Sequence, residues 1–229
     1  MTALYPSFGM RGLRAYARWW LPRHVAGVTV AGLEHLPRSG PALILARHYH
    51  HEIDGAVLLA RLPRPVHIVV ALDWVRSAAE RRRMERACRW AAWPVILRPE
   101  RVRDAAAYRA DETGAYLRRG LRDAAALLRA GRVVAVFPEG YPAVDAAGRA
   151  PAPRVRGGIG LLPFGEGFRA IARRAERDGG AATPIVPFGL RYERLGESWR
   201  VRAAFGAPLA SETSTAELQR IVGELSTTG

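Results

Sequence analysis

Short apolar runs alternate with longer segments along this chain, and they predict strands separated by helices. The runs are rich in Val, Ile, Leu and Ala and lie close to glycine or proline, as buried strands do. The predicted strands are residues 28–31, 42–46, 66–71, 93–97, 133–137, 182–190 and 198–205.

The segments between these runs have helical composition or a helical spacing of apolar residues. The predicted helices are a segment that starts at residue 56, and residues 74–90, 104–130, 168–177 and 216–225. In the last of them, one face carries Leu218, Ile221, Val222 and Leu225. Strands that alternate with helices predict an α/β fold, in which helices cover a central, mostly parallel sheet.

The N-terminal segment has a different pattern, because aromatic residues and arginines are interspersed over residues 4–21. Its apolar stretches are too short for a signal peptide or for a spanning helix, which needs about 20 apolar residues. Two interpretations stay open: an amphipathic helix at a membrane surface, or an ordinary helix docked on the core. We expect an N-terminal amphipathic, interfacial helical segment over residues 1–27 and one α/β domain over residues 28–229.

Charge is the most unusual bulk property of the 229-residue chain, whose formal net charge is +14 and whose pI is about 11.3. Every basic residue other than histidine is an arginine. Such a surface attracts polyanions, which include nucleic acid, anionic lipid head groups and acidic carrier proteins. A basic protein that binds nucleic acid or an anionic surface without catalysis is therefore one hypothesis. The single cysteine, Cys88, excludes an intrachain disulfide.

Half of the six histidines lie between residues 47 and 55, directly after the predicted strand 42–46. Open α/β sheets build their sites at the carboxyl ends of strands. A histidine with the ordinary pKa of about 6.5 can accept a proton at neutral pH, and a carboxylate can orient it. His48 and Asp54 form such a pair if the turn folds back, whereas His50 or His51 shares a face with Asp54 if the turn is helical. The residues themselves leave all three histidines open as the base.

These histidines have two other interpretations. They can cap a helix and stabilise a turn, or they can bind a metal, because His-x-His followed by acidic residues is a ligand pattern. Zinc sites usually need further ligands, but no histidine follows His67 and the chain has one cysteine. We therefore expect acid-base chemistry and no metal site.

Other candidate site residues follow later strands. Arg98 comes after strand 93–97, where its guanidinium suits a carboxylate or a phosphate. Glu139 and Gly140 follow strand 133–137 after a proline, which favours a rigid turn. The next segment, residues 141–160, is predicted to be a loop over the site, and it contains Arg154 and Arg156.

The strand ends thus carry, in order, a His/Asp cluster, an arginine, a Pro-Glu-Gly turn and an Ile-Val-Pro strand. This order resembles the glycerolipid acyltransferase family, which includes the 1-acylglycerol-3-phosphate acyltransferases. Four blocks carry the resemblance, with a Phe-Gly pair before an alanine-rich helix as a further feature. The blocks are residues 47–54, 95–98, 136–140 and 184–187, and the further feature is residues 164–172.

The resemblance implies that His48 deprotonates an acceptor hydroxyl while Asp54 orients it, with His50 and His51 as reserve bases. The hydroxyl would attack the thioester of acyl-CoA or acyl-carrier protein, without a covalent acyl-enzyme, a cofactor or a metal. The acceptor would be a lysophospholipid such as 1-acylglycerol-3-phosphate. The implied substrate-binding residues are Arg98, Glu139, Gly140, Arg154 and Arg156.

The resemblance also implies a role in phospholipid biosynthesis, in the cytoplasm and peripherally on the inner face of the cell membrane, with no nucleic-acid partner. The chain departs from the family's pattern at several positions. Five residues rather than four separate His48 from Asp54, which indicates a one-residue insertion. Tyr141 and Pro142 replace the threonine and arginine that normally follow the third block, and Gly165 replaces a lysine. These departures affect the expected identity of the acceptor more than the expected reaction, the transfer of an acyl group.

Overall fold

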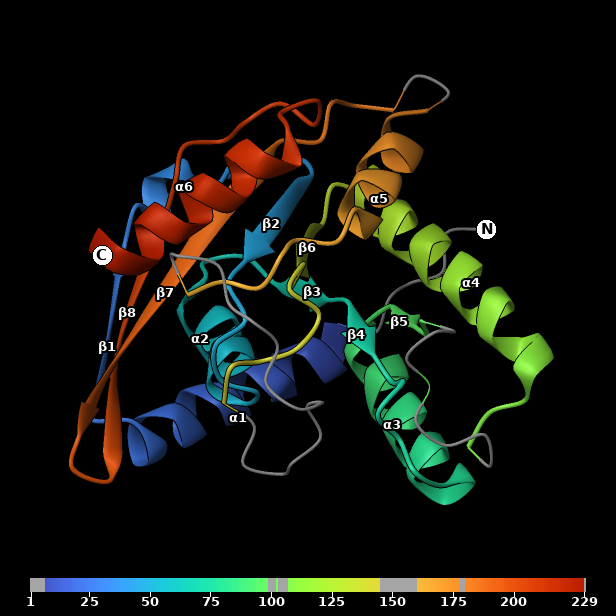
Figure 1. Cartoon of the computed structure of the whole chain (residues 1–229), viewed down its shortest axis with the longest axis horizontal. Helices are drawn as coiled ribbons and strands as arrows, with labels where there is room; N and C mark the ends of the chain where they lie inside the picture. The colour runs from blue at the N-terminus through green and yellow to red at the C-terminus, as the bar shows by residue number, and fades with distance from the viewer. Residues whose placement is uncertain (1–6, 99–101, 103–106, 145–159, 178–179, 229) are drawn as a thin grey trace.

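Six strands form a sheet at the centre of the molecule (Figure 1). The computed structural model describes residues 7–98, 102, 107–144, 160–177 and 180–228. The strand order is β1-β8-β7-β2-β6-β3, and only β7 and β8 pair antiparallel, as a hairpin. The strands are β1 Gly27–Ala31, β2 Ala42–Ala46, β3 Val66–Ile68, β6 Val133–Val136, β7 Ile185–Leu195 and β8 Ser198–Phe205.

Strand β2 lies in the middle of the sheet between β6 and β7, and none of its five residues is exposed. Its side chains alternate between two hydrophobic cores, one on each face of the sheet. Ala42, Ile44 and Ala46 belong to one core, and Leu43 and Leu45 belong to the other. Burial on both faces explains why β2 reads as a continuous apolar run in the sequence.

Helices cover both faces of the sheet (Figure 1). Helices α1 and α2 contribute to the core that contains Ile44, whereas α4, α5 and α6 contribute to the core that contains Leu43. These helices are α1 Ser7–His24, α2 Ile53–Arg61, α4 Ala110–Arg129, α5 Gly167–Glu176 and α6 Thr215–Thr228. A short 3-10 helix, η1 Leu33–His35, follows β1. The predicted α/β fold with a mostly parallel, helix-covered sheet and an N-terminal helix is confirmed.

A smaller unit extends from one end of the sheet. Strands β4 Val70–Ala71 and β5 Val95–Ile96 pair parallel, and helix α3 Ala78–Ala91 connects them. Leu72, Val75 and Leu97 form a separate small core with Ala107 and Tyr108.

The predicted strand 66–71 is divided between the two sheets, so its prediction as one strand was wrong. The N–H of Val69 donates to the carbonyl of Ala135 at 2.9 Å, whereas the N–H of Val70 donates to Pro94 at 2.9 Å. The chain therefore changes hydrogen-bond partner between two adjacent residues. The predicted strand 93–97 is limited to β5. Because β5 pairs with β4, it lies outside the main sheet.

Helix α3 begins later than residue 74, the predicted start. The hydroxyl of Ser77 accepts a hydrogen bond from the N–H of Glu80 at 3.2 Å, which is an N-cap arrangement. Helix α4 begins at Ala110 rather than at residue 104, and residues 103–106 lie outside the described part of the chain.

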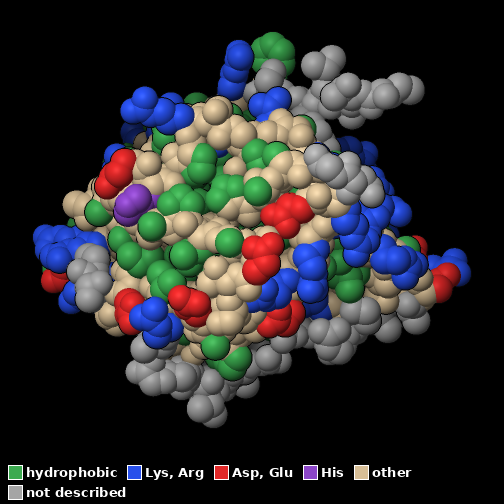
Figure 2. Space-filling model, turned by 90° about the horizontal axis from the view of Figure 1, so that it is seen from above, with side chains coloured by type: hydrophobic (Ala, Val, Ile, Leu, Met, Phe, Trp, Pro, Cys, Tyr) green, Lys and Arg blue, Asp and Glu red, His purple; other side chains and the backbone are tan. Residues whose placement is uncertain are grey.

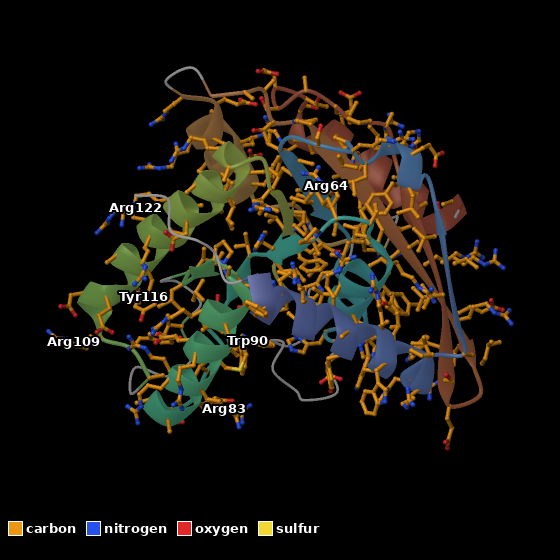
Figure 3. All side chains as sticks on the ribbon, turned by 180° about the vertical axis from the view of Figure 1, so that it is seen from behind. Arg64, Arg83, Trp90, Arg109, Tyr116 and Arg122 are labelled. Carbon is orange, nitrogen blue, oxygen red and sulfur yellow. The ribbon has the colours of Figure 1, made fainter. Side chains whose placement is uncertain are left out.

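Helix α1 docks on the core and also exposes large aromatic side chains. Met10, Ala17 and Leu21 are buried, whereas Phe8 and Trp19 are 80% and 53% exposed. The helix crosses the end of α3 close to Trp90 (Figure 3). Among the described helices, none is long and apolar enough to cross a membrane.

Candidate active site

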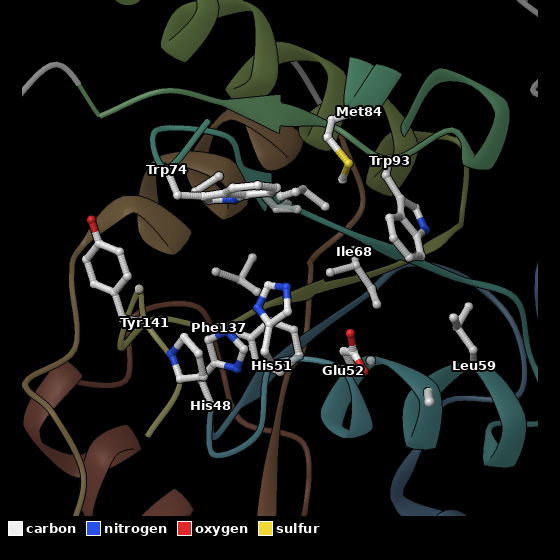
Figure 4. A pocket seen from close by; sticks show the side chains of 18 of the residues that line it. His48, His51, Glu52, Leu59, Ile68, Trp74, Met84, Trp93, Phe137 and Tyr141 are labelled. Atoms are coloured by element: carbon white, nitrogen blue, oxygen red, sulfur yellow. The ribbon is translucent and has the colours of Figure 1, made fainter. Parts of the chain in front are cut away.

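His48 and Asp54 meet at the carboxyl end of β2. His48 lies two residues after the strand, and Asp54 lies in the first turn of α2, where it is fully buried. The Nδ1 atom of His48 and the Oδ2 atom of Asp54 are 2.9 Å apart. With Nδ1 oriented by the carboxylate, the opposite ring nitrogen, Nε2, is the one available to a substrate, and His48 lines a cavity (Figure 4).

The turn between the two residues folds around the Asp54 carboxylate. Oδ2 accepts hydrogen bonds from the backbone N–H groups of Tyr49 at 2.7 Å and of His50 at 3.0 Å. The ring of Tyr49 stacks on Tyr192 with 4.5 Å between ring centroids. The turn therefore accommodates five intervening residues and keeps His48, rather than Tyr49, beside the carboxylate.

Tyr192 on β7 completes the surroundings of Asp54 and was missed by the sequence analysis. Its hydroxyl donates to Oδ1 of Asp54 across 138 residues of sequence. Burial, and then the charge of Asp54, raise the pKa of Tyr192 well above its ordinary value, so the hydroxyl remains a donor. No motif or spacing marks this tyrosine, since only the pairing of β7 beside β2 brings it to the site.

Glu139 supports the backbone of the site instead of lining the cavity. It is 3% exposed; Oε1 accepts from the N–H of His48 at 2.7 Å, and Oε2 accepts from the N–H of Leu162 at 2.8 Å. Two residues earlier, the ring of Phe137 stacks on the His48 ring with 4.4 Å between centroids. The segment after β6 thus fixes the position of His48 through its backbone and its ring.

Arg98 lines the same cavity but is held by an acidic residue that the sequence analysis did not select. Its Nε and Nη2 atoms lie 2.5 Å and 3.1 Å from the two carboxylate oxygens of Asp73, which is fully buried. Nη1 donates to the carbonyl of Gly140 at 3.2 Å, and the guanidinium lies 4.6 Å from the ring centroid of Tyr141. Asp73 lies two residues after β4, and nothing in the sequence marked it as a site residue, because acidic residues are common in loops.

The reserve histidines lie on different sides of the turn. His51 lines the cavity and faces the edge of Trp74, with 6.4 Å between ring centroids. His50 is placed toward Tyr192 and Trp199 and does not line the cavity. The remaining predicted residues, Arg154 and Arg156, lie outside the described residues.

The cavity has a volume of about 470 Å³ and is mostly apolar (Figure 4). Such a volume is typical of pockets for small or elongated ligands. Its walls come from α1, α2, α3 and the strand ends, and among the described residues its acidic, basic and histidine side chains are His48, His51, Glu52 and Arg98. The apolar lining includes Leu13, Ala17, Trp20, Ala56, Leu59, Ile68, Trp74, Met84, Trp93 and Ile96.

Known proteins share the fold that carries this site. The chain is similar in structure to the 1-acyl-sn-glycerophosphate (LPA) acyltransferase PlsC from Thermotoga maritima, with a TM-score of 0.59 and 15% sequence identity. The similarity covers 94% of this chain and 77% of that chain. A search of curated proteins gave no match. A family model described as Acyltransferase matches residues 27–191, a range that includes His48, Asp54, Arg98 and Glu139. The chain therefore belongs to the Acyltransferase family, as the sequence motifs predicted.

Proposed function

We propose that this protein transfers a fatty acyl chain from an acyl thioester, either acyl-CoA or acyl-carrier protein, to the hydroxyl of a lysolipid. The observation that carries the proposal is the His48–Asp54 hydrogen bond beside an apolar cavity. Family membership supports the class of reaction, an O-acyl transfer. The donor, the acceptor and the roles of individual residues are the proposed part.

In the proposed mechanism, Nε2 of His48 removes the proton from the acceptor hydroxyl as its oxygen attacks the thioester carbon. Nδ1 donates to Asp54, whose charge stabilises the imidazolium that forms. When the tetrahedral intermediate collapses, the carbon–sulfur bond breaks and the thiolate takes the proton from His48. The products are an ester and a free thiol, and the enzyme returns to its starting protonation state.

The cavity supplies a place for an acyl chain next to this base. Transfer of apolar surface out of water contributes roughly 25 cal/mol per Å², so a long chain gains affinity from an apolar lining. The cavity wall that α1 and α2 build is apolar, with Leu13, Ala17, Ala56 and Leu59. His48 lies on the same cavity, so a thioester whose chain occupies this space would present its carbonyl carbon to the base.

The acceptor is expected to bind on the polar side of the cavity. The similar PlsC acts on 1-acyl-sn-glycerophosphate, and an acceptor of this lysophospholipid type is the starting expectation. Arg98 and the Gly140 backbone lie at the cavity, whereas Glu139 acts through the backbone of His48. A contribution from Arg154 and Arg156 remains a proposal about residues outside the described range.

We also propose a peripheral contact with an anionic membrane, on the cytoplasmic face, through α1. Phe8, Tyr16 and Trp19 are exposed on this helix, and exposed arginines lie among them. Aromatic residues at head-group depth and arginines near anionic lipid are the features of an interfacial helix. Leu13, Tyr16 and Ala17 of the same helix line the cavity, so lipid substrates would have a short path to the site.

The test is acyl transfer from labelled acyl-CoA and acyl-carrier protein to a panel of lysolipids. His48→Ala should lower kcat by about 10²- to 10⁴-fold, because removal of a general base typically costs that much. His50→Ala is a matched control, since this neighbouring ring does not line the cavity, and it should retain most of the activity. Circular dichroism and the melting temperature should show that both variants are folded.

Two outcomes would contradict the proposal. Activity of His48→Ala close to that of the natural chain would remove the base from the mechanism. Absence of transfer to every acceptor, combined with salt-dependent binding to nucleic acid that persists in His48→Ala, would favour the hypothesis of a basic binding protein.

A further inference from the structure

We propose that the acceptor of this acyltransferase is a lysolipid without a phosphate monoester, whose head group is uncharged or carries an amine. This inference rests on the proposed function and specifies its substrate class. It follows from the charges at the cavity, above all from the pairing of Arg98 with Asp73.

Asp73 neutralises the only arginine among the described residues that line the cavity. The two side chains form a bidentate pair, with the guanidinium fork on both carboxylate oxygens. Asp73 is fully buried, whereas 16% of the Arg98 side chain is exposed. The Arg98 guanidinium therefore reaches the cavity as part of a neutral ion pair with Asp73 and not as an unpaired positive charge.

Arg98 is also held in place by its other contacts. Nη1 donates to the carbonyl of Gly140, and the guanidinium lies over the ring of Tyr141. A shift of Arg98 toward a ligand would leave the buried Asp73 carboxylate without its charge partner, which is strongly unfavourable. The contacts indicate that Arg98 connects the segment after β4 to the turn after β6.

The rest of the described cavity lining offers no compensating positive charge. The two residues after Gly140 that line it, Tyr141 and Pro142, are uncharged, and Glu52 contributes a carboxylate. His48 must be neutral to act as a base, so within the described lining His51 is the remaining side chain that can carry a positive charge. A phosphate monoester carries a charge of about −1.5 to −2 at neutral pH and needs more cationic neighbours than this.

The same charges suit a head group of the opposite kind. An uncharged glycerol hydroxyl needs no counter-ion, and an ammonium group near the cavity is attracted by Glu52. The ring of Trp74, which also lines the cavity, can receive a cation on its face. The proposed acceptor is therefore an amphiphile that combines an acyl chain and a free hydroxyl with a phosphate-free head group.

The experiment compares kcat/KM for three acceptors with the same acyl chain and the same donor. They are lysophosphatidate, 1-monoacylglycerol, and a monoacylglycerol ether that carries a trimethylammonium group. We expect at least one phosphate-free acceptor to exceed lysophosphatidate by about tenfold or more, as expected when charge complementarity sets specificity. A higher value for the trimethylammonium lipid than for monoacylglycerol would assign the cationic head group, and the reverse would assign the uncharged one.

Asp73→Asn tests the cause of the preference, because it removes the negative charge and leaves Arg98 positive. The ratio of kcat/KM for lysophosphatidate to that for monoacylglycerol should rise by about tenfold or more. Asp123→Asn is the matched control, since it makes the same charge change on the surface of α4, and it should leave the ratio unchanged. If Asp73→Asn does not fold, the ratio measured with the natural chain still decides the proposal.

A preference of the natural chain for lysophosphatidate would overturn this inference. Loss of that preference in the double variant Arg154→Ala/Arg156→Ala would then identify the loop arginines as the phosphate site. Absence of transfer to all three acceptors would instead be a failure of the proposed acyl transfer, so the two failures are distinguishable.

Discussion

Asp54 accepts four hydrogen bonds, from the His48 ring, from the N–H groups of Tyr49 and His50, and from the hydroxyl of Tyr192. A buried carboxylate is costly unless donors surround it. The two backbone donors and the tyrosine compensate the burial, and the remaining interaction orients His48. The strength of the His48–Asp54 pair is therefore set in part by Tyr192, which does not line the cavity.

Tyr192→Phe should show this positioning role. Loss of the hydroxyl removes one donor, so more of the Asp54 charge acts on His48 and favours the protonated ring. The acid limb of the kcat/KM profile should move to higher pH, and kcat should fall by about 3- to 30-fold with little change in KM. The measurement is the pH–rate profile of both proteins between pH 5 and 9.

Tyr108→Phe is the control for this experiment. Tyr108 is also a buried tyrosine whose hydroxyl donates a hydrogen bond, but its acceptor is the carbonyl of Leu72 and not a site residue. This variant can lose stability and should keep the pH profile. An unchanged acid limb in Tyr192→Phe would show that the tyrosine is merely structural.

The residue scale also shows what the sequence could reveal about the site. His48, His50, His51 and Asp54 lie within seven positions, so local spacing selected the cluster, whereas the family resemblance selected His48 among its histidines. Asp73 and Tyr192 reach the site only through the packing of distant strands, and neither belongs to a motif. Glu139 was predicted to bind substrate; in the structure its carboxylate accepts hydrogen bonds from the backbone N–H groups of His48 and Leu162.

At the scale of elements, helix α4 packs very closely on the small sheet. A Cβ atom added at Gly120 would lie 2.3 Å from the carbonyl oxygen of Val95 and 2.6 Å from the side chain of Ile96. Both atoms belong to β5, which cannot move without disturbing its pairing with β4. The absence of a side chain at Gly120 is therefore what allows this contact.

Gly120→Ala should lower the free energy of unfolding by about 1–3 kcal/mol, because the contact would be overpacked. Gly114→Ala in the same helix should be neutral or stabilising by up to about 1 kcal/mol, since its nearest neighbour is the flexible end of Arg118. Urea unfolding of both variants measures the difference. Equal stability of the two variants would contradict the tight contact between α4 and β5.

Element types were predictable here, whereas the sheet that each strand joins was not. Strands β2 and β6 are evident as apolar runs because continuous apolar character reports burial on both faces of the sheet. The change of partner between Val69 and Val70 depends on carbonyl groups of Ala135 and Pro94, and no local pattern encodes it. Helix α3 was predicted, but its N-cap was not recognised. A serine followed three residues later by a glutamate, here Ser77 and Glu80, is a known signal for the start of a helix.

At the scale of the whole molecule, the net charge of +14 favours approach to anionic surfaces. On the face that Figure 2 shows, arginines are mixed with acidic residues, so the attraction there is not confined to one patch. The proposed docking through α1 would require more than this general attraction, and the exposed aromatic residues of that helix are what would supply it. The distinction can be tested with variants of equal charge.

Arg11→Ala/Arg18→Ala on α1 should weaken binding to vesicles that contain anionic lipid by roughly 30-fold, since each basic residue near the surface contributes about 1 kcal/mol. Arg118→Ala/Arg122→Ala on α4 lowers the charge equally and should have a much smaller effect (Figure 3 shows Arg122). Vesicle sedimentation at fixed ionic strength measures both. Equal losses would mean that net charge, and not α1, determines the contact.

The place of β2 between β6 and β7 has a consequence for the growing polypeptide. During synthesis, the segment that contains the whole His48–Asp54 pair emerges long before Tyr192 and before β7. Until then β2 has one open edge, and Asp54 lacks one of its donors. A truncated product that ends before residue 185 would therefore carry both His48 and Asp54 and still have an incomplete site and an aggregation-prone strand edge.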